Sequence, residues 1–254
     1  MQEATALARQ MMSLLDLTSL SGRETSEDVR HLCGRACSPC GRVAAVCLFP
    51  RFLREARTAL DRWGIRGVRL ATVANFPAGE EDSARAVAEI ELCLSNAADE
   101  VDLVMPYGAL LRGDSGFVRQ FLRTCRKACP VLLKVILESG RLGSPDLIRT
   151  ASRLAIECGA DFLKTSTGRT PVHATPEAAR IMLEAIAESG LPVGFKASGG
   201  LRTMADAQVY LDLAAEIMGP DWIGPGRFRF GASQLLDELL RVAAQEGEPC
   251  VGSA

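Results

Sequence analysis

The chain has 254 residues, of which 48% are hydrophobic and 24% are charged, and its formal net charge is −2. This length suits one large α/β domain, and the balanced charge offers no electrostatic footprint for nucleic acid or an anionic membrane surface. No uncharged apolar run approaches the roughly 20 residues that a transmembrane helix needs.

The first segment, MQEATALARQMMSLLDL, mixes Glu3, Arg9 and Asp16 into a helical apolar pattern. A secretory signal peptide needs an uninterrupted apolar core, so we expect none here. Nine cysteines are scattered along the chain without a regular framework of spacings. This usage is typical of reduced thiols, and we therefore expect a cytoplasmic protein.

Short apolar and β-branched segments then alternate with longer segments of helical period. The helix boundaries are well marked: Thr175 precedes a proline, Thr203 stands three residues before Asp206 as in a capping box, and Gly190 stands where a helix ends. The predicted strands cover residues 14–18, 42–48, 67–73, 100–105, 131–137, 161–166, 192–198 and 227–233.

Eight strand–helix units without a linker predict a single-domain (β/α)₈ TIM barrel. We expect one domain over residues 1–254, with the barrel at about 14–240 and a flexible C-terminal tail at 245–254. The alternative is an open doubly wound sheet. That alternative is disfavoured because the first strand is not followed by a glycine-rich dinucleotide-binding turn.

Ionisable side chains cluster at or near the C-terminal ends of the predicted strands, where barrel enzymes place their active sites. Alternation along a strand puts Gly194 on the same face as Lys196, and this glycine would leave room for the lysine. A structural ion network is the other explanation of such a cluster. Convergence from five strands favours an active site, and the five residues are Asp16, Asp102, Lys134, Lys164 and Lys196.

Lys164 and Lys196 on neighbouring strands indicate amine chemistry. A lysine has an ordinary pKa of ~10.4, and both burial and a second ammonium group nearby lower it. The neutral amine can then condense with a carbonyl to a Schiff base, as in class I aldolases. The chain contains only His31 and His173, neither of them at a strand end, so we expect neither a catalytic metal nor another cofactor. His173 follows a proline in a loop and is expected on the solvated surface.

Glycine-rich turns after the last strands predict a phosphate site. Gly199 and Gly200 follow the seventh strand, and Gly231 and Ser233 precede the last helix. Backbone amides reach a phosphate where no side chain blocks them, and a helix N-terminus favours the anion. Gly168 and Arg169, after the sixth strand, would lie at the same rim.

Several of these segments closely resemble the 2-deoxyribose-5-phosphate aldolase family, in order and with little insertion from about residue 14 to 240. The pair FLKTSTG and GFKASGG is highly specific. The other segments are DLTSL, AAVCLFPRF, ATVANFPAG, DEVDLVMPYGALLRG, LLKVILESG, TPEAARIML and RFRFGAS.

The resemblance implies reversible cleavage of 2-deoxy-D-ribose 5-phosphate to D-glyceraldehyde 3-phosphate and acetaldehyde, without a metal and in a possible homodimer. Lys164 would form the Schiff base, Lys196 would lower its pKa, and Asp102 would be the acid/base partner acting through water. The substrate would also contact Asp16, Cys47, Lys134, Thr165 and the phosphate residues Gly168, Arg169, Gly199, Gly200, Gly231 and Ser233.

The chain departs from the family pattern at four places. Arg169 replaces a common lysine, and arginine keeps the charge and binds phosphate bidentately. Ala197 replaces a proline, and Gln234 replaces a serine that would add a hydroxyl contact. The C-terminus lacks the tyrosine that in some members is proposed to assist proton transfer.

Three alternatives remain beside this function. The first is a Schiff-base aldolase for a different short-chain phosphorylated sugar, and the second is a catalytically silent barrel that binds sugar phosphates. The third is an iron–sulfur cluster at Cys33, Cys37 and Cys40, whose spacing suits such a cluster. It is disfavoured because Cys33 falls in a helical pattern before the second strand.

Overall fold

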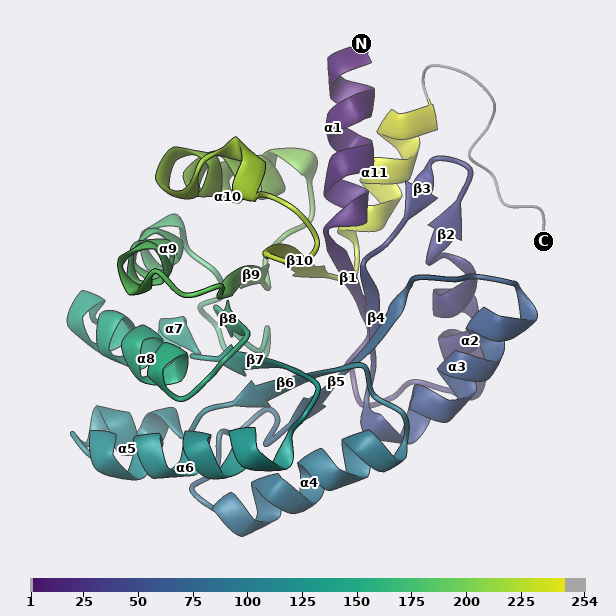
Figure 1. Ribbon diagram of the computed structural model, residues 1–254. Helices are drawn as coiled ribbons and strands as arrows, with labels where there is room; N and C mark the ends of the chain where they lie inside the picture. Colours follow the sequence, from purple (N-terminus) through teal and green to yellow (C-terminus); the bar gives the residue numbers. More distant parts are fainter. Residues whose placement is uncertain (1, 245–254) are drawn as a thin grey trace.

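The computed structural model describes residues 2–244, in which eight parallel strands close into a barrel surrounded by helices (Figure 1). The strands pair in the order β1-β10-β9-β8-β7-β6-β5-β4, and β1 also pairs with β4. Closure confirms the predicted (β/α)₈ barrel and excludes the open sheet. The strands are β1 Leu15–Thr18, β4 Ala45–Cys47, β5 Arg69–Ala74, β6 Glu100–Val104, β7 Leu132–Ile136, β8 Phe162–Lys164, β9 Gly194–Ser198 and β10 Phe228–Ala232.

Each of the eight predicted segments overlaps one barrel strand. A short hairpin of β2 (Cys37–Ser38) and β3 (Gly41–Arg42) was not predicted, because two-residue strands leave no alternation to recognise. The single-domain boundaries stay a prediction, and the predicted flexible tail 245–254 lies outside the described residues.

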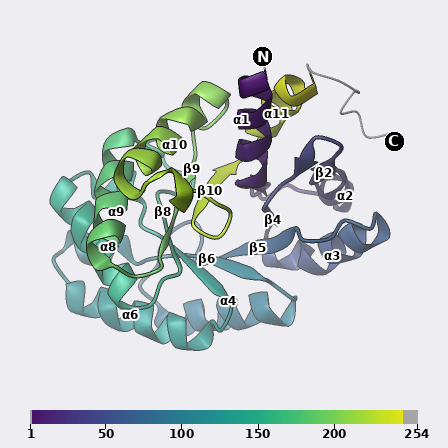
Figure 2. The same cartoon turned by 45° about the horizontal axis from the view of Figure 1, so that its top comes forward.

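Helices surround the barrel, and α1, before the first strand, lies beside α11 at the end of the described chain (Figures 1 and 2). None of the helices between residues 2 and 244 has the length and apolar character of a membrane span. The α-helices are α1 Gln2–Ser13, α2 Ser26–Gly34, α3 Leu53–Arg62, α4 Ser83–Ser95, α5 Tyr107–Leu111, α6 Ser115–Ala128, α7 Ser139–Leu142, α8 Pro145–Glu157, α9 Pro176–Ser189, α10 Met204–Met218 and α11 Leu235–Ala243, with 3₁₀ turns η1 Pro50–Phe52 and η2 Pro220–Trp222.

The predicted helix boundaries are confirmed. Thr203 and Asp206 form both bonds of a capping box at the start of α10, and the Thr175 side chain accepts a hydrogen bond at the start of α9. Gly190 ends α9 with a left-handed backbone, φ 63°. These boundaries fix where the loops that carry the glycine-rich turns begin and end.

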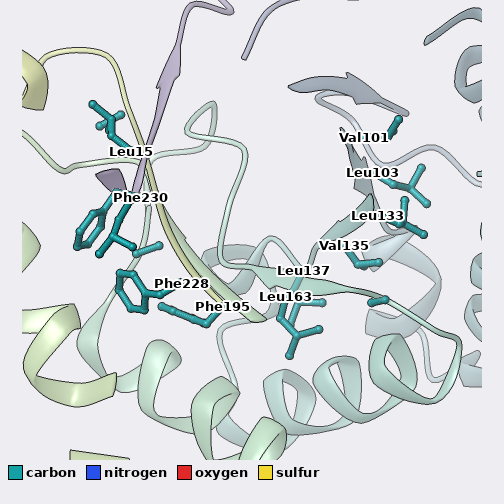
Figure 3. Packing of buried hydrophobic residues seen from close by; sticks show 14 of the residues in the cluster. Leu15, Val101, Leu103, Leu133, Val135, Leu137, Leu163, Phe195, Phe228 and Phe230 are labelled. Carbon is teal, nitrogen blue, oxygen red and sulfur yellow. The ribbon is translucent and has the colours of Figure 1, made fainter. Parts of the chain in front are cut away.

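Strand alternation separates an apolar outer face of the barrel from a polar interior. Figure 3 shows Val135, Leu163 and Phe195 packed between the strands and the surrounding helices. Each of these buried residues is the immediate neighbour of a lysine that must therefore point inward: Lys134, Lys164 and Lys196. The apolar packing of the helices thus directs three ammonium groups into the barrel.

The cysteines only partly match the expectation of reduced thiols. That expectation was wrong for Cys40, which is disulfide-bonded. Among residues 2–244, the free cysteines are Cys33, Cys37, Cys47, Cys93, Cys125, Cys129 and Cys158.

Candidate active site

Two lysines share one carboxylate inside the barrel: Lys164 ends β8, and Lys196 and Asp102 are the middle residues of β9 and β6. The Nζ atoms of Lys164 and Lys196 each lie 2.8 Å from Oδ2 of Asp102. The two lysines are register partners in parallel strands, so their side chains leave the sheet on the same face. Asp102 and Lys196 are fully buried, and Lys164 is 2% exposed. The structure thus brings these three predicted catalytic residues together.

Further ion pairs extend this group through the barrel interior. Lys134 Nζ lies 2.8 Å from Oδ1 of Asp102 and 2.6 Å from Oε2 of Glu100. Arg229 donates to Oε1 of Glu100 at 3.0 Å and also to Asp16. Lys134 is therefore held between two carboxylates, which raise its pKa although burial acts in the opposite direction. It is held as a cation and is not free to act as a nucleophile.

The pKa values of the two facing lysines move in opposite directions. Burial lowers the pKa of Lys164, and the Lys196 ammonium adds to this effect against the attraction of Asp102. Burial also acts on Lys196, but Asp102 and Asp16 together outweigh it and raise its pKa. The second carboxylate makes the difference, since Asp16 Oδ2 lies 2.5 Å from Lys196 Nζ. Lys164 is thereby the lysine favoured for the neutral form.

The charge of the whole group favours the same assignment. Burial alone raises the pKa of Asp102, but the three neighbouring lysines lower it well below its ordinary value. Three carboxylates therefore face four cationic groups, and the cluster becomes neutral when one amine loses its proton. Buried clusters with unbalanced charge are costly. The members are Asp16, Glu100, Asp102, Lys134, Lys164, Lys196 and Arg229.

Glu100 and Arg229 were missed in the sequence, although a signal for both was present. Glu100 stands two residues before Asp102, and Arg229 stands two residues before Gly231. Side chains two apart along a strand share a face, so alternation directs both into the barrel. Applying alternation to every strand would have found them.

The sequence-based role of Gly194 was wrong. The space that a Cβ at Gly194 would need is taken by the ring of Phe162, whose Cε1 would lie at 2.5 Å. The glycine that makes room for Lys196 is Gly231 on the neighbouring strand, where a Cβ would lie 3.0 Å from the lysine Cε. Gly231 therefore helps to shape the site in addition to its predicted phosphate contact.

Cys47 and Thr165 lie close to the ion cluster in different surroundings. Cys47 is fully buried with Ala45, Ala71 and Val73 in a small apolar group, and burial raises the pKa of its thiol. Thr165 exchanges hydrogen bonds with the backbone of Ser198, so its hydroxyl links β8 to β9. Their substrate contacts stay predictions.

A cavity of about 650 Å³ opens over the ends of β1, β8, β9 and β10. Its lining begins three residues after Lys164, at Thr167, and two residues after Lys196, at Ser198, whereas the two lysines themselves are buried and do not line it. All six predicted phosphate residues line it, namely Gly168, Arg169, Gly199, Gly200, Gly231 and Ser233.

The cavity suits an anion. Gly199 and Gly200 have φ of 85° and 80°, a backbone that side chains rarely adopt. The Gly199 N–H donates to the Gly231 carbonyl at 3.4 Å, whereas no Cβ blocks the approach of an anion to the Gly200 backbone. Ser233 stands just before α11, whose N-terminus adds a favourable partial charge. Arg169 and Arg202 supply full positive charge. Arg202 was not singled out in the sequence, although it stands only two residues after Gly200.

His173 is not on the solvated surface, as the sequence had suggested. It is half-buried, lines the cavity and packs against Gly199, and its Nδ1 is buried without a hydrogen-bond partner. Nothing local in the sequence indicates this position, because it depends on how the loop after β8 folds back over the loop after β9.

The three cysteines considered for an iron–sulfur cluster do not form a ligand set. The Cys33 thiol donates to the Ala56 carbonyl inside the core, Cys37 is exposed on β2, and Cys40 is disulfide-bonded. Between residues 2 and 244, no three His, Cys, Asp or Glu side chains gather in a way that suits a metal ion.

Known proteins are similar to this chain in sequence and structure over almost its whole length. A deoxyribose-phosphate aldolase from Agrobacterium fabrum is 50% identical over 250 residues, which are 98% of this chain and 94% of that protein. A structure from Toxoplasma gondii ME49, provisionally named a deoxyribose-phosphate aldolase, has a TM-score of 0.90 at 26% identity and covers 97% of this chain and 99% of its own. A tetrameric deoxyribose phosphate aldolase from Aeropyrum pernix has a TM-score of 0.68 at 26% identity. The match covers 94% of this chain and 96% of that protein.

A family-level match covers most of the barrel. The family model described as DeoC/LacD family aldolase matches residues 10–240, which include every strand and every residue of the ion cluster. With the 50% identical relative, this match shows the family. The chain belongs to the DeoC/LacD family of aldolases.

Proposed function

We propose that this chain is a class I aldolase that reversibly cleaves 2-deoxy-D-ribose 5-phosphate to D-glyceraldehyde 3-phosphate and acetaldehyde. One observation carries the proposal: Lys164 is a buried amine with a lowered pKa at the end of β8, and the glycine-containing turn that begins three residues later lines an anion-suited cavity. The name of the Agrobacterium relative supports the same substrate.

Lys164 provides the nucleophile. Its neutral amine attacks the aldehyde carbon of the open-chain sugar, and loss of water gives an iminium ion on Nζ. Lys196 stays protonated because it lies between Asp102 and Asp16, and its ammonium supplies the proton that leaves with the water. Asp102 bonds both amines through one oxygen, so it can pass a proton between them without moving.

Cleavage follows from the electron demand of the iminium. Removal of the proton from the C3 hydroxyl, through a water on Asp102, breaks the C2–C3 bond and releases D-glyceraldehyde 3-phosphate. The bonding electrons move into the iminium and give an enamine on Lys164. Protonation of the enamine carbon and hydrolysis then release acetaldehyde and restore the amine.

Reductive trapping tests the proposal. The protein is incubated with 2-deoxyribose 5-phosphate and borohydride, and the adduct is located by peptide mass. We expect one adduct, on Lys164, and none in Lys164→Ala. An adduct on Lys196 or Lys134 in the unaltered protein would overturn the assignment of the nucleophile.

A second candidate keeps the chemistry and changes the phosphorylated sugar. It is motivated by Gln234 and Arg169, which line the cavity at positions where the family commonly has serine and lysine. Trapping with another short-chain sugar phosphate, but not with 2-deoxyribose 5-phosphate, would favour it. A silent sugar-phosphate-binding barrel would bind the sugar without any adduct, and it leaves the costly buried charges unexplained.

The homodimer and the cytoplasmic location stay predictions. The homodimer comes from the family resemblance, and light scattering coupled to size-exclusion chromatography tests it directly. A particle of twice the chain mass of 27.2 kDa is expected. A monomer or a tetramer would replace this prediction.

A further inference from the structure

A buried carboxyl group that the proposed mechanism does not use stands behind the cavity. Glu138 follows β7, is 0% exposed and has a left-handed backbone with φ of 54°. Such a backbone is costly for a residue with a Cβ and persists where the surroundings hold it. In the described part of the chain, the hydrogen bonds of its carboxyl group all go to one turn, residues 167–170.

The two oxygens of Glu138 hold the two flanks of this turn. Oε2 accepts from the backbone N–H of Thr167 at 3.2 Å and from its hydroxyl at 2.5 Å. Oε1 accepts from the hydroxyl of Thr170 at 3.1 Å. Gly168 and Arg169, the residues that line the cavity, lie between these two anchored positions.

The hydrogen bonds also reach the turn's centre. The backbone N–H of Arg169 donates to the Thr167 hydroxyl oxygen at 3.1 Å, and that hydroxyl donates its own proton to Glu138. Bonds linked in this way polarise one another, and a charged acceptor strengthens them. The Arg169 backbone is therefore fixed through Thr167, although Glu138 does not touch Arg169.

A second contact joins the same two segments. Gly140, at the start of α7, packs so closely against the loop that a Cβ there would lie 2.4 Å from the backbone oxygen of Val172. This backbone cannot be displaced without moving the loop. The segment after β7 therefore supports the loop after β8 at two points, by hydrogen bonds at 167–170 and by packing at Val172.

We infer that Glu138 is a positioning residue, which fixes the Gly168–Arg169 turn in the geometry that receives the phosphate group of the substrate. The inference rests on the proposed function for the identity of the substrate. The geometry explains a negative group next to an anion site: the Glu138 carboxylate accepts from three donors of the turn, and Glu138 is fully buried and does not line the cavity.

Kinetics with and without the phosphate group test this role. Gln in place of Glu138 keeps one acceptor oxygen but faces the other flank with an NH₂ donor. We expect Glu138→Gln to raise KM for 2-deoxyribose 5-phosphate about tenfold with little change in kcat. The ratio of kcat/KM for 2-deoxyribose 5-phosphate to that for 2-deoxyribose falls by about the same factor. If kcat/KM fell equally for both substrates, Glu138 would have a general structural role, and the inference would be overturned.

Titration with inorganic phosphate separates this inference from the proposed function. We expect the unaltered protein to bind inorganic phosphate and Glu138→Gln to bind it about tenfold more weakly. If both proteins bound inorganic phosphate equally well, the role of Glu138 would be overturned, and the proposed aldolase activity would be unaffected. Weaker binding by Glu138→Gln, in a protein that traps no 2-deoxyribose 5-phosphate, would support the role of Glu138 and overturn the proposed function.

Two further variants complete the design. Gly140→Ala displaces the loop sterically while Glu138 itself stays unchanged, and the same loss of phosphate affinity is expected. Thr170→Val removes the donor to Oε1 together with the contact of the same hydroxyl to the Val172 carbonyl, and it decides by the same kinetic ratio if Glu138→Gln does not fold. The control is Glu177→Gln, an exposed carboxyl at the start of α9 that does not bond the turn, and no change is expected.

Discussion

The neighbouring strands β8 and β9 carry the same residue in the same register, and yet the two lysines provide different chemistry. Lys164 and Lys196 are Cα partners, both are buried, and both lie 2.8 Å from the same oxygen of Asp102. The pKa of the first is lowered and that of the second is raised. Burial acts in the same direction on both, so it cannot cause the difference.

The difference comes from β1, which lies two strands from β9 round the barrel. Lys196 has a second carboxylate, Asp16, at 2.5 Å, whereas Lys164 has Asp102 alone. One carboxylate does not offset the burial of an ammonium group next to another cation, and two carboxylates do. The barrel thus distinguishes the two lysines by the number of neighbouring carboxylates, and changing that number tests the comparison.

The largest expected effect is that of Lys164→Ala. Removing the only amine favoured for the neutral form eliminates the covalent route, so kcat falls on the order of 10⁴-fold or more. The measurement is release of acetaldehyde, with circular dichroism as the control for folding. A loss of less than about tenfold would mean that Lys196 can replace Lys164, and the distinction between the two strands would fail.

The next effect is that of Lys196→Leu, for which we expect kcat to fall about 10²- to 10³-fold near neutral pH. Removing this ammonium removes one cause of the lowered pKa of Lys164, so that pKa rises and the neutral amine appears only at higher pH. The acidic limb of the kcat/KM profile is therefore expected to move toward alkaline pH. An unmoved limb with unchanged turnover would remove Lys196 from the mechanism.

The sequence was sufficient for the barrel because each strand shows its own pattern. Leu163 between Phe162 and Lys164, or Val101 between Glu100 and Asp102, already alternates between outward and inward positions. The same pattern contains Glu100 and Arg229, which also occupy inward positions of their strands. The charge balance of the site depends on every ionisable residue at an inward position, and the structure identifies these residues.

Contacts between loops could not be predicted in this way. His173 against Gly199, and Glu138 against Thr167 and Thr170, join segments that no periodicity relates. Gly194 is a similar case, because its neighbour Phe162 on β8 occupies the space that alternation alone assigned to Lys196. Strand register places backbones, whereas such side-chain neighbours depend on rotamers and on loop paths.

Asp16→Asn is expected to make Lys196 resemble Lys164, because only Asp102 then remains beside it. We expect kcat to fall about tenfold and the unfolding free energy to fall by about 3 kcal/mol, since Arg229 and Lys196 both lose a buried partner. Urea denaturation measures the second effect. Unchanged stability would mean that Asp16 carries no net charge in the cluster.

The pH dependence of that stability gives an independent check. The neighbouring Lys196 and Arg229 outweigh burial and lower the pKa of Asp16 below its ordinary value of 3.8. Its contribution is therefore present above pH 3.8 and is lost as pH falls toward the lowered folded-state pKa. The unaltered protein should lose stability on acidification below about pH 4 more steeply than Asp16→Asn does. Parallel curves would contradict the ion pair.

The smallest expected effects come from two glycines that face the barrel interior beside the lysines. Gly231→Ala places a Cβ 2.7 Å from Ser198 Oγ and 3.0 Å from Lys196 Cε, so it displaces the lysine end, and we expect kcat to fall several-fold. Gly194→Ala instead meets the Phe162 ring at 2.5 Å, so we expect a loss of about 1–3 kcal/mol of stability and little change in kcat. Thermal unfolding and turnover of both variants measure the contrast. Gly194→Ala could instead lower kcat as much as Gly231→Ala does. The position of Lys196 would then depend on the packing around Gly194, and the number of neighbouring carboxylates could not be the only difference between β8 and β9.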